Sequence, residues 1–283
     1  MRAVGVRRSE GGFEGVGRLR LRYRTNEVQN PRAALLIVHG LGEHAGRYQQ
    51  FADSIAAFGV STYAYDQRGH GTSEGRRGHV ASFHVLMQDL DRFRREVSGL
   101  VEVRVPLFIL GHSMGGLVAL RYLEEYDAPV SGAVIIAPWL GTGVDVPRWK
   151  ITMASALTRL LPAVPFRNAV DPDALSRDPE IVRAYREDPL VHDRITPRLF
   201  TEVSSAMGLV LQHSDRIASP LLFMLPGADR LVDTQRTLAF ARSISAADVS
   251  IKVYPGHYHE LLNEPDRATI VRDLRDWLID HAG

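Results

Sequence analysis

The sequence contains no cysteine, and this absence excludes disulfide bonds, thiolate nucleophiles and cysteine metal sites. It also has no uninterrupted apolar run that approaches the length of a transmembrane helix. The basic N-terminal residues 1–10 lead into two glycines without the apolar segment of a secretory signal. With a formal net charge of only +1, the chain gives no indication of a nucleic-acid partner. We therefore expect a cytoplasmic protein that acts on a neutral small molecule.

The length and composition are typical of a globular protein. Hydrophobic residues make up 45% of the 283 residues, and charged residues make up 24%. This length exceeds that of an average domain, but α/β folds often use it for a single core. We expect one domain that carries an insertion.

The stretch PLFILGHSMGG places Ser113 between a predicted strand and a predicted helix. Residues 107–110 are apolar throughout, as in a strand covered on both faces, and residues 117–126 have apolar side chains at helical spacing. The chain must turn sharply between them, and Gly111 and Gly115 flank the turn because larger side chains would collide with the neighbouring elements. A bare Gly-x-Ser-x-Gly pattern arises by chance with a probability on the order of a tenth. The flanking strand and helix favour a nucleophilic serine over chance.

Two backbone N–H groups are candidates for an oxyanion hole, which binds the negative oxygen of an acyl-transfer intermediate. The N–H of Met114 lies at the predicted start of the helix, whose positive end favours negative charge. The apolar run 33–38 ends in the loop HGLGEH, which has little steric bulk and can bring the N–H of Leu41 beside the serine. We interpret His39 and His44 as structural residues that hydrogen-bond within the loop, because no carboxylate or cysteine cluster completes a metal site with them.

Two charged segments lie outside this motif. Residues 18–24, RLRLRYR, alternate strictly, so the arginines share one face of a predicted strand. We favour a peripheral strand whose charges discourage edge-to-edge pairing over attraction to anionic lipid. Residues 66–80 are rich in glycine and charge, and they predict a loop at the carboxyl end of the strand 60–65. Asp66 and Arg68 are interpreted as bracing each other and the loop backbone rather than as catalytic residues.

From residue 139 to about residue 215 the pattern changes to helices alone. A capping side chain precedes proline at three predicted helix starts: Asp171, Asp178 and Thr196. This segment is therefore predicted to be a helical insertion. Residues 151–166 within it are strongly apolar, and Leu160 and Leu161 are candidates for contact with an acyl chain at the lip of a lid. The alternative is that these residues form the insertion's own core.

A candidate acid follows the next predicted strand. The apolar run 220–225 leads into a tight turn and then Asp229, just beyond the carboxyl edge of the predicted sheet. Asp233 competes for the same role, but it stands directly before the helical segment 234–244. We assign Asp233 to helix capping.

Two histidines, His257 and His259, follow the last predicted strand, residues 249–254. A general base for the serine needs one ring nitrogen near Ser113 Oγ and the other hydrogen-bonded to Asp229. Only one of the two histidines can meet both conditions. These requirements alone leave the choice open.

The chain order of serine, aspartate and histidine resembles that of the α/β-hydrolase superfamily. Five blocks extend the resemblance to the monoacylglycerol lipase and lysophospholipase group: HGLGEHAGRY, DQRGHGTSEGRRGHV, GHSMGG, GADRLVD and YPGHYHELLNE. The blocks are spread over nearly the whole chain. The resemblance implies an α/β-hydrolase fold with a mostly parallel sheet flanked by helices. Residues 1–138 and 216–283 would form the catalytic core, and residues 139–215 would form a helical cap.

The resemblance also favours one histidine over the other. In this group the catalytic histidine follows a Tyr-x-Gly-x-x-His pattern, which falls on His259 because Tyr254 and Gly256 fill the first two fixed positions. His257 then occupies a variable position and is interpreted as a loop or pocket-wall residue.

The implied activity is that of a serine hydrolase of carboxylic esters, in which Ser113 attacks, His259 transfers the proton and Asp229 orients the histidine. Monoacylglycerols or similar single-chain lipid esters are the implied substrates, and no metal or organic cofactor is expected. We expect at most transient contact between the cap and lipid surfaces. The alternatives are a short-chain carboxylesterase, a lysophospholipase, or an amide or peptide hydrolase on the same fold. A ligand-binding module without turnover is disfavoured because all three catalytic positions are filled.

Overall fold

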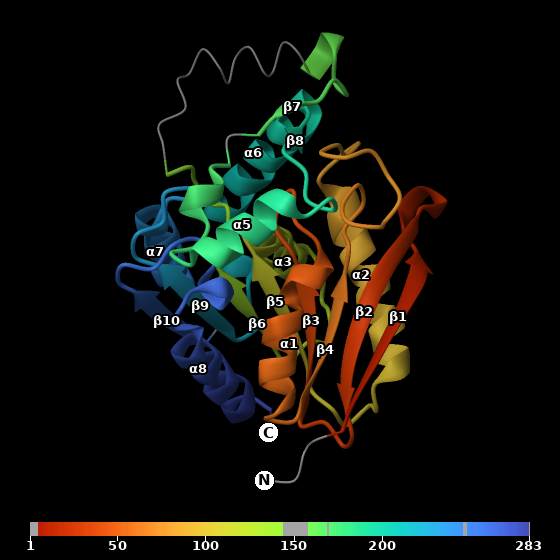
Figure 1. Ribbon diagram of the computed structural model, residues 1–283, viewed down its shortest axis with the longest axis vertical. Helices are drawn as coiled ribbons and strands as arrows, with labels where there is room; N and C mark the ends of the chain where they lie inside the picture. Colours follow the sequence, from red (N-terminus) through yellow and green to blue (C-terminus); the bar gives the residue numbers. More distant parts are fainter. Residues whose placement is uncertain (1–4, 144–157, 169, 246–247, 283) are drawn as a thin grey trace.

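A mixed sheet of eight strands crosses the middle of the molecule (Figure 1). The computed structural model describes residues 5–143, 158–168, 170–245 and 248–282. In sheet order the strands are β1 (Val6–Glu14), β2 (Arg20–Val28), β4 (Val60–Tyr65), β3 (Ala33–Val38), β5 (Leu107–His112), β6 (Gly132–Ile136), β9 (Leu221–Pro226) and β10 (Val249–Tyr254). β2 runs antiparallel to both of its neighbours, and the strands from β4 onwards are parallel. The predicted mostly parallel sheet is confirmed.

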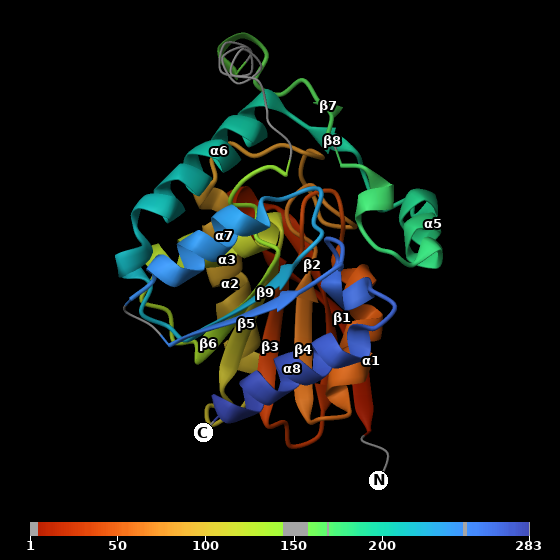
Figure 2. The same ribbon diagram turned by 90° about the vertical axis from the view of Figure 1, so that its left-hand side faces the viewer.

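Helices cover both faces of the sheet, which explains why its inner strands are apolar on both sides. One face packs against α1 (Gln49–Ala56) and α8 (Arg267–Asp280), and the other against α2 (His84–Leu100), α3 (Met114–Glu125) and α7 (Thr234–Ser243) (Figure 2). In β3, Leu35 and Ile37 join the first of these apolar layers, whereas Leu36 and Val38 join the second. The short 3-10 turns η2 (Ala45–Tyr48) and η5 (Leu261–Asn263) each add two buried residues to the core, whereas η1 (Val16–Arg18) has no buried residue.

The parallel strands end together at one edge of the sheet. Val38, the last residue of β3, is paired with Gly111 near the end of β5. His112, the last residue of β5, is paired with Ile136, the last residue of β6. The loops that follow these strands therefore start side by side, where open α/β sheets place their functional sites.

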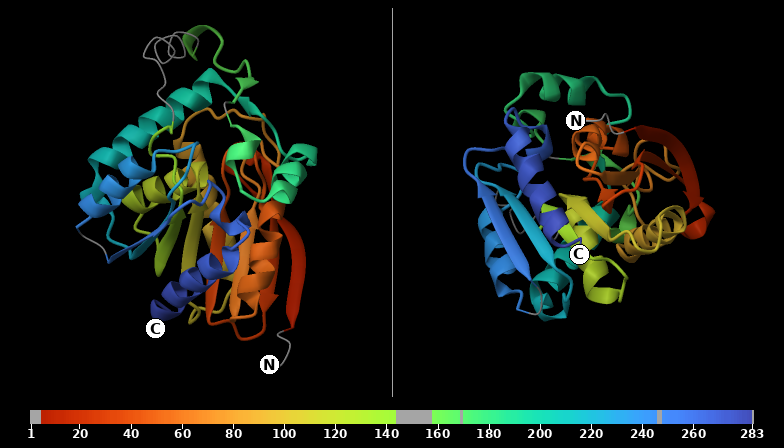
Figure 3. Two further views of the ribbon diagram at one scale, coloured as in Figure 1. Left: turned by 60° about the vertical axis from the view of Figure 1, so that its left-hand side comes forward. Right: turned by 90° about the horizontal axis from the view of Figure 1, so that it is seen from below.

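The insertion between β6 and β9 lies over this edge of the sheet (Figure 3). Its described elements are β7 (Phe166–Arg167), η3 (Pro172–Ala174), α5 (Pro179–Glu187), β8 (Arg194–Ile195), α6 (Pro197–Gln212) and η4 (Ser214–Arg216). The three predicted helix starts are confirmed, because Asp171, Asp178 and Thr196 each accept a hydrogen bond from an N–H of the turn that follows. The pairing of β7 with β8 was not predicted, since two-residue strands leave no sequence pattern. Nowhere in the described ranges is a helix long and apolar enough to span a bilayer.

β1 is not predicted by the sequence pattern, because Phe13 is its only fully buried residue. It pairs with the whole of β2, which therefore lies inside the sheet rather than at its edge. The expectation that the arginines of residues 18–24 protect an open edge is wrong for this reason. Arg20 and Arg22 still face solvent, and Leu21 between them is buried, as the alternation predicts.

Candidate active site

Ser113 lies at the turn between β5 and α3, with backbone angles of φ 53° and ψ −117° that residues other than glycine seldom adopt. A Cβ atom on Gly115 would lie 2.0 Å from the carbonyl oxygen of Val38, and one on Gly111 would lie 2.6 Å from that of Gly115. The predicted reason for both glycines is therefore confirmed. The N–H of Ser113 donates to the carbonyl of Ile136 at 3.1 Å and ties the turn to β6. The half-buried serine is thus held at the carboxyl edge of the sheet.

Asp229 and His259 come from the loops after β9 and β10 and form a hydrogen-bonded pair. His259 Nδ1 lies 2.7 Å from Asp229 Oδ2. Asp229 Oδ1 accepts hydrogen bonds from the N–H groups of Leu231 at 2.8 Å and Val232 at 3.0 Å. Because an ionised carboxylate only accepts, Nδ1 of the histidine carries a proton. Nε2 is left as the basic nitrogen of the neutral ring.

Each residue of this pair shifts the pKa of the other in the direction that favours its charged form. Burial alone would lower the pKa of His259, but the negative charge of Asp229 and its hydrogen bond outweigh burial and raise this pKa above its ordinary value. Burial alone would raise the pKa of Asp229, but His259 and two backbone hydrogen bonds lower it below its ordinary value. Asp229 is therefore ionised at neutral pH and stabilises the positive charge that His259 gains on accepting a proton.

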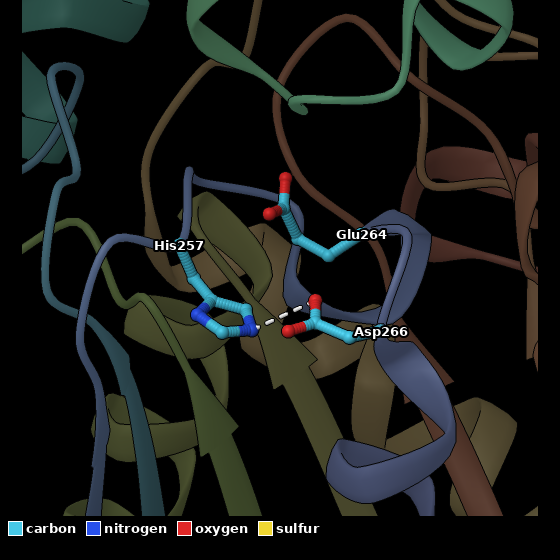
Figure 4. Close-up of side chains that lie close together, drawn as sticks. All are labelled: His257, Glu264 and Asp266. Carbon is cyan, nitrogen blue, oxygen red and sulfur yellow. Dashed lines mark ion pairs between the residues drawn. The ribbon is translucent and has the colours of Figure 1, made fainter.

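His257 makes different contacts and is turned toward Asp266 (Figure 4). Its Nε2 lies 3.0 Å from Asp266 Oδ1, and its Nδ1 lies 3.0 Å from the carbonyl oxygen of Pro255. The structure thus brings His259, and not His257, to Asp229.

Figure 4 also shows a group that could hold a metal ion, because the ligand atoms of His257, Glu264 and Asp266 lie within 4.8 Å of one another. Arg177 already binds both carboxylates, with Nη2 2.7 Å from Asp266 Oδ1 and Nε bonded to Glu264. A metal cation would have to displace this guanidinium from a buried carboxylate. We therefore interpret the group as an ion-pair network that fastens the loop carrying the histidines.

The N–H groups of Leu41 and Met114 have no hydrogen-bond acceptor within the described part of the chain, and the same is true of Gly115 and Gly116 in the first turn of α3. Met114 follows Ser113 directly. Gly40, which precedes Leu41, lies against the serine, since a Cβ atom on Gly40 would be 3.1 Å from Ser113 Cβ. Unpaired donors at this place suit the developing negative charge of an oxyanion.

The insertion is bonded to the loop of residues 39–44. The N–H of His192 donates to the carbonyl oxygen of Gly42 at 2.9 Å. His44 Nε2 lies 2.8 Å from Asp188 Oδ2, and its other ring nitrogen caps the turn η2. The structural interpretation of His44 is confirmed, although its partner Asp188 belongs to the insertion rather than to the loop.

The loop after β4 is braced partly as predicted. The carboxylate of Asp66 accepts hydrogen bonds from backbone N–H groups of its own loop and of η2. His39 Nε2 accepts from the N–H of Gln67 at 2.9 Å, which makes His39 a link between two loops. The predicted bracing of Asp66 by Arg68 is wrong, because Arg68 pairs instead with Asp89 of α2, with Nε 2.6 Å from Oδ2. A local pattern could not identify a partner that lies on a distant helix.

Leu160 and Leu161 are exposed residues of the insertion, at 78% and 48%. Val164 and Phe166 are exposed as well, so the outer insertion displays several large apolar side chains. The alternative in which the two leucines are core residues disagrees with this exposure. Residues 151–157 of the predicted apolar segment lie outside the described residues.

Glu43 is the functional candidate that the sequence pattern failed to identify. It lies in the motif HGLGEH, in which roles were predicted only for the glycines, the histidines and Leu41. Its side chain is almost completely buried beside the serine turn. The presence of an acidic residue in a glycine-containing loop was the one feature of the sequence that could have pointed to Glu43.

A parallel sheet, a strained serine turn at its carboxyl edge and a histidine–aspartate pair on later loops define the class of α/β hydrolases. Residues 29–266 match the family model described as Serine aminopeptidase, S33. This match covers most of the chain, and the chain belongs to this family.

Several full-length relatives are lipases by name. The chain is 35% identical to a monoacylglycerol lipase of Mycolicibacterium smegmatis, covering 98% of this chain and 99% of the relative. It is 30% identical to the monoglyceride lipase of Homo sapiens, covering 88% of this chain and 82% of the relative. Among solved structures, that of Paleococcus ferrophilus monoacylglycerol lipase superposes with a TM-score of 0.83 at 31% identity, covering 98% of this chain and 99% of the other.

Proposed function

We propose that this chain is a serine hydrolase that cleaves monoacylglycerols or similar single-chain lipid esters. The observation that carries the proposal is the 2.7 Å contact between His259 Nδ1 and Asp229 Oδ2 at the same sheet edge as the strained turn of Ser113. The names of the full-length relatives support the choice of lipid ester.

The proposed reaction has two halves. Ser113 Oγ attacks the ester carbonyl while His259 Nε2 takes its proton, and the N–H groups of Leu41 and Met114 hold the oxyanion. The tetrahedral intermediate then releases the alcohol, which receives the proton from His259, and leaves an acyl-serine. Water, deprotonated by His259, attacks the acyl carbon, the bond from this carbon to Ser113 Oγ breaks, and His259 returns the proton to Oγ, which leaves a free fatty acid and the original enzyme. Asp229 stabilises the imidazolium in both halves.

We also propose that residues 139–215 act as a cap on the core formed by residues 1–138 and 216–283. The position of the insertion over the sheet edge supports this division. Its helix α6 packs on the core through Leu199 and Val203, which are buried in the same apolar layer as α3. The exposed Leu160 and Leu161 then lie on the part of the cap that an incoming acyl chain or lipid surface can reach.

Replacing both Leu160 and Leu161 by serine should reduce hydrolysis of long-chain monoacylglycerols much more than hydrolysis of a short soluble ester. Each leucine contributes about 1.5 to 3 kcal/mol of apolar contact if an acyl chain buries it fully. A short ester does not reach these side chains. We expect kcat/KM to fall for long acyl chains alone, measured over a chain-length series.

The melting temperature is the control for this double variant. Because both side chains are already exposed, their replacement should leave the melting temperature nearly unchanged. An equal loss for long and short esters, together with a lowered melting temperature, would show that the leucines stabilise the cap and do not contact the substrate.

An amide or peptide hydrolase is the second candidate, because the family's description names a serine aminopeptidase. A parallel assay of monoacylglycerols, short-chain esters, lysophospholipids and aminoacyl amides separates the candidates. We expect the highest kcat/KM for monoacylglycerols. A higher value for aminoacyl amides would replace the ester assignment, and absence of labelling of Ser113 by a fluorophosphonate would contradict a hydrolase altogether.

A further inference from the structure

The side chain of Glu43 lies between the backbone of its own loop, residues 39–44, and the serine turn. Its Oε1 atom accepts three hydrogen bonds, from the N–H of Gly40 at 2.6 Å, from His112 Nδ1 at 2.8 Å and from the hydroxyl of Tyr48 at 2.9 Å. Arg47 Nη1 lies 3.2 Å from its other oxygen. One carboxylate therefore holds two segments that come from different strands.

The buried charge of Glu43 is costly to keep, since only 5% of its side chain is exposed. Burial alone would raise its pKa, but the hydrogen bond and charge of His112 and the charge of Arg47 outweigh burial and keep the pKa well below its ordinary value. Glu43 therefore accepts hydrogen bonds as a carboxylate throughout the neutral range. A neutral side chain would fill the same space without the cost of desolvation, so packing alone does not explain a carboxylate here.

Both segments held by Glu43 lead directly to catalytic positions. A Cβ atom on Gly40 would lie 2.8 Å from Glu43 Oε1 and 3.1 Å from Ser113 Cβ, so the glycine is enclosed between the two side chains. The next residue is Leu41, whose N–H has no acceptor among the residues that the structure describes. His112 directly precedes the serine, and its ring centre lies 4.8 Å from that of His259.

We propose that Glu43 is a positioning residue, whose carboxylate fixes the oxyanion donor of Leu41 relative to Ser113 and adds negative charge beside His259. It acts through Gly40 and His112 and does not touch the substrate. This role rests on the proposed function of Ser113 as the nucleophile.

The substitution Glu43→Gln tests the role, because glutamine keeps the shape and removes the charge. Misplacing an oxyanion donor by about 1 Å can cost on the order of a hundredfold in rate. We expect kcat for a soluble ester to fall by about ten- to a hundredfold while KM changes little, since the ground-state contacts remain. Labelling of Ser113 by a fluorophosphonate should slow to a similar degree.

The pH profile gives a second readout that a purely structural role would not change. His259 faces the charges of Asp229, Glu260 and Glu43 as well as the ring of His112. Negative charge favours the protonated histidine, so Glu43→Gln should lower the pKa of His259. Because the base must be neutral to act, the acid limb of kcat/KM should move to lower pH.

Asp89→Asn is the matched control. Asp89 is also a buried carboxylate that binds an arginine and a backbone N–H, but it lies on α2 away from the serine turn. Its loss should lower the melting temperature and leave the labelling rate and the pH profile unchanged. If Glu43→Gln does not fold, His112→Phe keeps a ring beside His259 without a bond to Glu43 and should show the same loss of kcat.

The positioning role would be overturned if a folded Glu43→Gln protein kept the labelling rate and the pH profile of the wild type. If Glu43→Gln does not fold, the same result in His112→Phe would overturn it. Equal kinetic losses in Asp89→Asn would overturn it as well. Failure of the wild-type protein itself to label would instead contradict the proposed function, so the two failures are distinguishable.

Discussion

Replacing Ser113 by alanine should remove nearly all esterase activity while the fold is retained. The change deletes the nucleophile and a single polar atom, and it leaves the oxyanion donors in place. In serine hydrolases such a loss reaches about a millionfold in kcat, and the residual rate comes from the oxyanion hole and from binding. The measurement is kcat on a soluble ester with a purified protein whose melting temperature is close to that of the wild type.

Ser54→Ala is a suitable control for this change. Ser54 is an exposed serine of α1 that donates only to the carbonyl of Gln50. Its replacement should leave kcat and fluorophosphonate labelling as they are in the wild type. Substantial esterase activity in a clean preparation of Ser113→Ala would contradict the proposed nucleophile.

His259→Ala should be as damaging as the loss of the serine, whereas His257→Ala should have a far smaller effect. Of the two histidines, His259 is the one that is bonded to Asp229, and without it neither half of the proposed reaction has a base. His257 pairs with the exposed Asp266, and an ion pair of this kind contributes about 0 to 1 kcal/mol to stability. The kcat/KM values of both variants on one ester test the ranking.

Each variant of this pair is the control for the other, because the two histidines lie two positions apart on one loop. The opposite ranking would assign the base to His257 and would require the loop to rearrange. A comparable loss in both variants with lowered melting temperatures would indicate damage to the loop rather than loss of a base.

The parts of the fold that local patterns determine could be predicted from the sequence. A buried strand in a parallel sheet is a short apolar run whatever its partners, so β3, β5, β6 and β9 were recognisable. Helix caps are also local features of the sequence. Asp233 accepts a hydrogen bond from the N–H of Arg236, as its assignment as a capping residue predicts. The serine turn was recognisable because its two glycines lie within a few residues of the serine, although the carbonyl that excludes a side chain at Gly115 belongs to Val38 of β3.

The parts that depend on distant partners could not be predicted. β1 is held by its pairing with β2 and carries little apolar pattern of its own. The partner of Arg68 lies on a distant helix, and His112, which bonds Glu43 to the serine turn, lies 69 positions further along the chain at the end of β5. Long-range pairs of this kind leave no periodicity, so sequence reasoning identified the groups proposed for the chemistry but missed the residue proposed to position them.

The hydrogen bond between the N–H of His192 and the carbonyl of Gly42 has a consequence for how this enzyme could be re-engineered. The insertion and the loop that carries Leu41 share this bond, so the two parts of the chain are not separate modules. A chimaera that exchanges the whole insertion for that of another hydrolase would also lose one support of the loop of residues 39–44. Graft boundaries that retain residues 188–196 would keep this support and also the bond between Asp188 and His44.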